Sequence, residues 1–113
     1  MKITLATLEQ ATGQEVFNQV RDHLLKQNKK SIVDSVCVYR GPDNTKCAAG
    51  CLMSDEEYDK KIEGVTWDDL TNDNIPYAHS DLITDLQFLH DNFPVEQWHV
   101  QLSEVALTYN LIP

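Results

Sequence analysis

The chain has 113 residues, of which 42% are hydrophobic and 24% are charged. These proportions are ordinary for a globular protein, and they exclude intrinsic disorder and collagen-like sequence. Eighteen acidic and nine basic residues give a net charge of −9. This balance argues against binding to nucleic acid or to an anionic membrane, because both depend on clustered lysine and arginine. The length suits a single domain, residues 1–113.

The first residues and the cysteines favour a cytoplasmic protein. Glu9 interrupts an apolar run that is already too short for a signal peptide. The longest apolar stretch, 47–53, is far shorter than the ~18–20 residues of a membrane-spanning helix. Cys37, Cys47 and Cys51 are an odd number, so we expect reduced thiols rather than a disulfide framework.

The first predicted element is an amphipathic helix that Thr12 or Gly13 would cap. Its apolar residues recur at helical spacing on one side: Val16, Phe17, Val20, Leu24 and Leu25. The helix is expected to end at Asn28-Lys29-Lys30, because lysines interact favourably with the helix dipole at its C-terminus.

A β-hairpin is expected next. Residues 36–40 are rich in β-branched and aromatic side chains, 41–44 (GPDN) is a turn signal, and 45–53 returns as the second strand. Within that strand, Ala48-Ala49-Gly50 predicts the close approach of a helix or of another backbone segment.

The second half of the chain predicts short helices and then a helical hairpin. A capping box predicts a short helix over 54–64, and Thr66 caps a further helical turn. A long helix over 80–92 is followed by a last helix that begins at Pro94, and the short connection predicts antiparallel neighbours. The fold class is therefore α+β: an N-terminal helix, a central antiparallel β-hairpin, short helices and a C-terminal helical hairpin.

Charge is distributed unevenly along the chain. Residues 1–53 carry seven cations and five anions, whereas residues 54–113 carry thirteen anions and two lysines. One interpretation is a solvated face that keeps a small protein in solution. A second is an acidic surface that binds a basic groove on another protein and competes there with nucleic acid. A divalent-cation site is a third, although no D-x-D-x-D-G loop with a closing glutamate is present.

The candidate partner-binding residues are the acidic clusters together with a tryptophan, which would anchor an interface if it were exposed beside them. They are Asp55, Glu56, Glu57, Asp59, Asp68, Asp69, Asp73, Asp81, Asp85 and Trp67.

Enzymatic and metal chemistry have no support from motifs. All three cysteines would share one face of the expected hairpin, but zinc would need a histidine as fourth ligand and prefers C-x-x-C pairs, so buried thiols are expected. No P-loop, zincin, nucleophile-elbow or dinucleotide motif is present. We therefore expect neither an enzyme nor a cofactor or metal. The alternatives are a zinc- or thiol-dependent protein using Cys37, Cys47 and Cys51, and a structural or assembly subunit.

The segment Tyr39-Arg40-Gly41-Pro42-Asp43, followed by KCAAGCL at 46–52, resembles a family of short proteins encoded in bacteriophage and prophage genomes. The match covers residues 7–64. The family has no assigned activity, so the resemblance carries no catalytic residues to this chain. It implies a small protein that inhibits or modulates a host protein with a basic surface, one that handles nucleic acid or acts in defence. The location would be the cytoplasm of an infected or lysogenic bacterium, and a homo-oligomer stays open.

Overall fold

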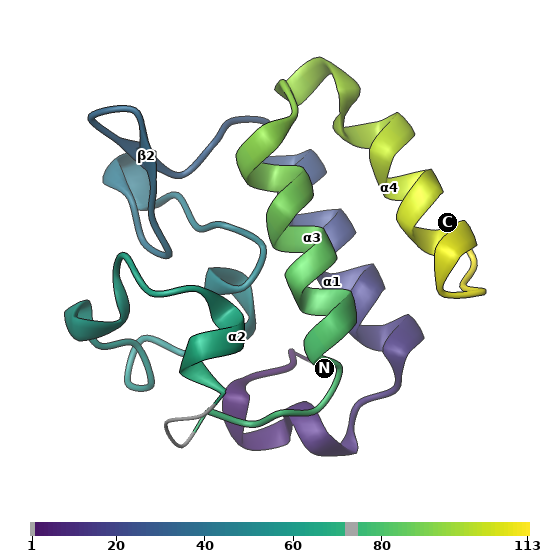
Figure 1. Ribbon diagram of the computed structural model, residues 1–113, viewed down its shortest axis with the longest axis horizontal. Helices are drawn as coiled ribbons and strands as arrows, with labels where there is room; N and C mark the ends of the chain where they lie inside the picture. The colour runs from purple at the N-terminus through teal and green to yellow at the C-terminus, as the bar shows by residue number, and fades with distance from the viewer. Residues whose placement is uncertain (1, 72–74) are drawn as a thin grey trace.

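The computed structural model describes residues 2–71 and 75–113, and Figure 1 shows the arrangement of their elements. The α-helices and strands are α1 (Gly13–Gln27), β1 (Ile32–Val33), β2 (Val36–Cys37), α2 (Trp67–Leu70), α3 (Ser80–Asn92) and α4 (Trp98–Thr108). Short 3-10 helices complete the described elements: η1 (Leu5–Gln10), η2 (Pro42–Asn44), η3 (Gly50–Leu52), η4 (Lys60–Ile62) and η5 (Val95–Gln97).

The three long helices form one side of the molecule. Helices α3 and α4 lie side by side, α1 lies behind α3, and the strands and α2 lie on the other side of α3 (Figure 1). The expected cap of α1 is confirmed, because the Thr12 hydroxyl accepts from the Glu15 amide at 3.1 Å and the Glu15 carboxylate accepts from the Thr12 amide at 2.8 Å. Asn28 ends this helix in the left-handed conformation.

The hydrophobic core lies where these helices meet. Phe17 of α1, Ile83 and Leu86 of α3, and Trp98 of α4 are all fully buried. Burying each such side chain contributes about 1.5–3 kcal/mol. The Trp98 indole N–H donates to the Phe93 carbonyl at 3.0 Å, so its polar atom is satisfied inside the core. The predicted helical hairpin is confirmed in α3 and α4.

The α+β class is confirmed, but the predicted position of the hairpin is wrong. The two strands pair antiparallel, with Ile32 opposite Cys37 and Val33 opposite Val36. The turn between them is Asp34-Ser35, with φ values of 50° and 68°, as a two-residue hairpin turn requires. The predicted turn at 41–44 does reverse the chain, yet it is followed by only one bridge, between Arg40 and Lys46.

Segment 45–53 is not a strand, because two of its amides donate to side chains of the helices and others donate to carbonyls of nearby turns. The Lys46 amide donates to the Gln27 side chain at 2.9 Å, and the Ala49 amide donates to the Gln87 side chain at 3.0 Å. Gly50 lies so close to the backbone of Tyr39 that an added Cβ would stand 2.1 Å from the Tyr39 carbonyl oxygen. The close approach predicted from the small residues is confirmed.

The capping box at residue 54 forms, but it does not begin a helix. The Glu57 amide donates to the Ser54 hydroxyl at 3.2 Å, and the Ser54 amide donates to the Glu57 carboxylate at 2.8 Å. That carboxylate also accepts the amides of Leu5 and Ala6, both at 2.9 Å. Glu57 therefore ties a turn to the start of η1, and the helical turn of this region comes later, at η4.

The expected cap of α2 is confirmed, because the Thr66 hydroxyl accepts from the Asp69 amide at 3.3 Å. Among the described residues, none of the helices combines the length and the apolar character that crossing a bilayer requires.

Candidate functional site

The predicted acidic residues divide into those that the fold uses and those that it leaves unpaired. Four carboxylates are engaged within the protein. Asp55 forms an ion pair with Arg40 at 2.6 Å, Glu57 accepts three backbone amides, Asp59 caps η4, and Asp85 accepts from the Tyr109 hydroxyl.

Four others are exposed and receive no hydrogen bond or ion pair from the described residues: Glu56, Asp68, Asp69 and Asp81. We call these four residues the open acidic set. Asp73 lies outside the described residues. The Asp55 side chain is 82% exposed although it is paired. The Arg40 guanidinium holds the pKa of this carboxyl below its usual range.

Trp67 is not the surface anchor that its position among acidic residues suggested. Only 2% of the residue is exposed, because the first turn of α2 directs it into the protein while Asp68 and Asp69 point outward. Its Nε1 atom is buried without a hydrogen-bond partner among the described residues.

A groove of about 610 Å³ lies beside Trp67. Its walls are residues 36–39 with β2 on one side, residues 64–68 at the start of α2, and the face of α3 that carries Thr84, Gln87, Phe88 and Asp91. We call it the α2–α3 groove. Phe88 and Val36 are 58% and 59% exposed, so the groove has apolar side chains open to solvent. No pattern in the sequence predicts this groove.

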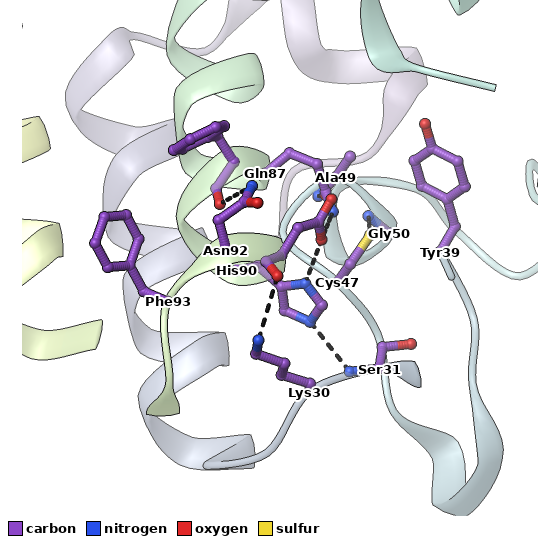
Figure 2. A network of polar contacts seen from close by, with 12 residues as sticks. Lys30, Ser31, Tyr39, Cys47, Ala49, Gly50, Gln87, His90, Asn92 and Phe93 are labelled. Atoms are coloured by element: carbon purple, nitrogen blue, oxygen red, sulfur yellow. Dashed lines mark hydrogen bonds and ion pairs between the residues drawn. The ribbon is translucent and has the colours of Figure 1, made fainter. Parts of the chain in front are cut away.

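A polar network on the same side joins α3 to the segment that precedes the strands. His90 is fully buried, and its Nε2 accepts from the Ser31 amide at 3.0 Å. Figure 2 shows the imidazole between α3 and residues Lys30 and Ser31. The Asp91 carboxylate lies 2.7 Å from His90 Nδ1 and accepts from Gln87 at 2.7 Å. The Lys30 ammonium donates to the Asp91 backbone carbonyl at 3.2 Å.

The thiol of Cys37 completes a Cys–His–Asp group, whose ligand-type atoms all lie within 4.8 Å of one another. Such a group can act as a nucleophile only if the imidazole can accept the thiol proton. Here Nε2 already accepts the Ser31 amide, so the ring proton is on Nδ1, facing Asp91. Burial, and then the charge of Asp91, raise the pKa of Cys37 to about 11. The arrangement keeps the thiol protonated and does not activate it.

The same hydrogen bond opposes metal binding at these three residues. A metal on His90 Nδ1 would require the ring proton to move to Nε2, where it would face the N–H of Ser31. Within the described residues no further histidine, cysteine or acidic group joins them. The network is a structural tie between α3 and the hairpin.

The three cysteines do not form the cluster that a zinc site built on them would need. Cys47 and Cys51 are buried, and no group of potential ligands in the described ranges contains them. The Cys51 thiol donates to the Ala48 carbonyl at 3.1 Å. Burial is the largest cause that raises the pKa of Cys51, to about 12, and it also raises the pKa of Cys47. Both thiols behave as small core side chains, as predicted.

Sequence reasoning missed His90 and Asp91, although one signal was available. Ile83, Leu86 and His90 fall at i, i+3 and i+7, which places the histidine on the buried stripe of its helix.

No protein-family model, curated protein or solved structure matches this chain.

Proposed function

We propose that this protein is a non-enzymatic binding protein whose acidic second half contacts a basic surface on another protein. One observation carries the proposal: residues 54–113 hold thirteen anions against two lysines, and in the described part of that segment Asp55 alone pairs with a lysine or arginine. The open acidic set is therefore available to an external cation.

An exposed carboxylate group can occupy the place of a phosphate on a protein that handles nucleic acid. Charge complementarity of this kind speeds association and selects the partner. Together with the resemblance to phage-encoded proteins, this favours a host nucleic-acid-handling or defence protein as the target, inhibited or modulated in the bacterial cytoplasm.

The experiment begins with capture of partners from a bacterial lysate, followed by measurement of the affinity for each captured protein against sodium chloride concentration. An acidic interface should weaken steeply with salt. The test variant neutralises the open acidic set: Glu56→Gln, Asp68→Asn, Asp69→Asn and Asp81→Asn. The matched control changes the net charge equally at four exposed acids of the first half, Glu9→Gln, Asp22→Asn, Asp34→Asn and Asp43→Asn.

We expect the test variant to bind at least about tenfold more weakly than the control, since each exposed ion pair contributes about 0.2–1 kcal/mol. Equal affinities of the two variants, or an affinity that does not change with salt, would contradict the proposal.

A further inference from the structure

We propose that the α2–α3 groove receives a basic–apolar segment of the partner protein. An apolar side chain of that segment packs over Val36 and Phe88, and a neighbouring lysine or arginine meets Asp68. This inference rests on the proposed function, and it adds which part of the partner is recognised and where.

The exposed apolar side chains are the first argument. Val36 comes from β2 and Phe88 from α3, so two separate elements each present a largely exposed apolar residue to the same groove. Phe88 is held in place on one side by Phe93, whose ring centre lies 6.3 Å away at an interplanar angle of 69°. A positioned aromatic ring at the wall of a groove is the usual form of an interface anchor.

The charge of the groove is the second argument, and it selects the occupant. The charged residues that line it are Asp68 and Asp91, both acidic, and no lysine or arginine is among its lining residues. Asp91 is already held by His90 and Gln87, whereas Asp68 belongs to the open acidic set. A cation that follows an apolar residue can therefore be paired at Asp68, and an acidic segment would be repelled.

The wall of the groove also contains two buried polar atoms, one of which belongs to a tryptophan. Trp67 Nε1 and Thr84 Oγ1 are both buried and have no hydrogen-bond partner among the described residues, and both residues line the groove. An indole N–H can only donate, and an unpaired buried donor is unfavourable. Because both atoms are buried, they do not contact a segment in the groove directly, but the Trp67 side chain lies in its wall and reports on binding there.

The two tryptophans supply the readout. We would titrate the ¹⁵N-labelled full chain with a capped hexapeptide of alternating leucine and arginine and follow the indole N–H signals by NMR. The Trp67 signal should shift, while the signal of Trp98, which is bonded to Phe93 in the core, should not. A leucine–glutamate hexapeptide should cause no shift, and a glycine–arginine hexapeptide should bind at least about fivefold more weakly because it lacks the apolar contact.

Matched variants separate the groove from the rest of the acidic surface. Phe88→Ala should weaken binding of the leucine–arginine peptide by about fivefold or more, and Asp68→Asn should weaken it by about two- to fivefold. Leu107→Ala, an exposed apolar residue outside the groove, and Asp81→Asn, an acid outside it, should leave the affinity within about twofold. Val36→Ser repeats the apolar test without disturbing Phe93, and a thermal melt confirms that each variant is folded.

The outcomes distinguish this inference from the proposed function. If the peptide does not bind, or binds as well to the Phe88→Ala and Val36→Ser variants, the groove is not the docking site. The charge variants and the captured partner would then still test the proposed function independently. If the leucine–glutamate peptide binds equally well, the charge argument for the occupant is wrong.

Discussion

Replacing Gly50 by alanine should be among the most damaging single-methyl changes in this chain. The added Cβ would stand 2.1 Å from the Tyr39 carbonyl oxygen, so the two backbone segments must separate by about 1 Å. Tyr39 resists that movement, because its amide donates to the Glu63 carboxylate at 2.9 Å and its hydroxyl donates to the Val65 carbonyl at 2.5 Å.

The expected loss follows from these contacts. Overpacking a tight site costs about 1–3 kcal/mol, and weakening one part-buried hydrogen bond adds about 1 kcal/mol. We therefore expect Gly50→Ala to lower the free energy of unfolding by about 3 kcal/mol, which corresponds to a fall in Tm of roughly 12 °C for a chain of this length.

Urea denaturation followed by circular dichroism at 25 °C measures this loss. Gly13→Ala is the matched control, since the nearest atom to its new Cβ is the Leu111 side chain at 3.9 Å. At the first residue of α1, alanine should leave stability unchanged or raise it by up to about 1 kcal/mol. If Gly50→Ala unfolds within about 0.5 kcal/mol of the wild type, the close approach of the two segments does not constrain the fold as argued.

Three further predictions concern the polar contacts. Replacing His90 by leucine should cost about 2–3 kcal/mol in urea denaturation, because the Ser31 amide loses its acceptor in a buried site. At about pH 8, iodoacetamide should alkylate Cys37 roughly a hundredfold more slowly than an unfolded cysteine peptide, since burial, and then Asp91, raise its pKa to about 11; Asp91→Asn should speed the reaction. Burial raises the pKa of Glu57, but the hydrogen bonds to its carboxylate together outweigh this and lower it. Its stabilisation is therefore complete above about pH 5 and is lost as the pH falls through the lowered pKa, so Glu57→Gln should destabilise by about 1 kcal/mol at neutral pH and less near pH 3.

Each of these predictions has a control, and two of the controls are exposed residues of the same type. His99→Leu and Glu56→Gln should change stability by less than about 0.5 kcal/mol. Alkylation in concentrated urea, followed by mass spectrometry, gives the rate for unprotected Cys37. Rapid alkylation of folded Cys37, an unchanged stability in His90→Leu, or a pH profile of Glu57→Gln that runs parallel to the wild type would each refute the corresponding argument.

The helices could be predicted from the sequence because their signals are local. Thr12 and Thr66 cap the elements that follow them, and the apolar stripes of α1, α3 and α4 are largely buried, although Leu25 at the edge of the α1 stripe is exposed. These signals depend on neighbours three or four residues away, so the rest of the fold cannot override them easily.

Residues 30–64 were harder to predict because several of their backbone amides bond to side chains that are distant in the sequence. The side chain of Gln27 accepts from the Lys46 amide, 19 positions away, and the side chain of Gln87 accepts from the Ala49 amide, 38 positions away. No local sequence pattern predicts such pairs. Strand propensity at 36–40 was real but was overridden, since only Val36–Cys37 finds a strand partner. The candidate site was affected in the same way: charge counts identified the acidic half, but not the groove that two elements build beside it.

The replacement of strand partners by side chains has a consequence for how this chain can vary. In a sheet, the backbone itself supplies donors and acceptors, so most side chains can be substituted without loss of the hydrogen bonds between strands. Here a change of Gln27 to glutamate or lysine would keep a polar residue while removing either the donor that serves two carbonyls or the acceptor that serves the Lys46 amide. Substitutions that count as conservative elsewhere are therefore disruptive at the glutamines that bond to this segment.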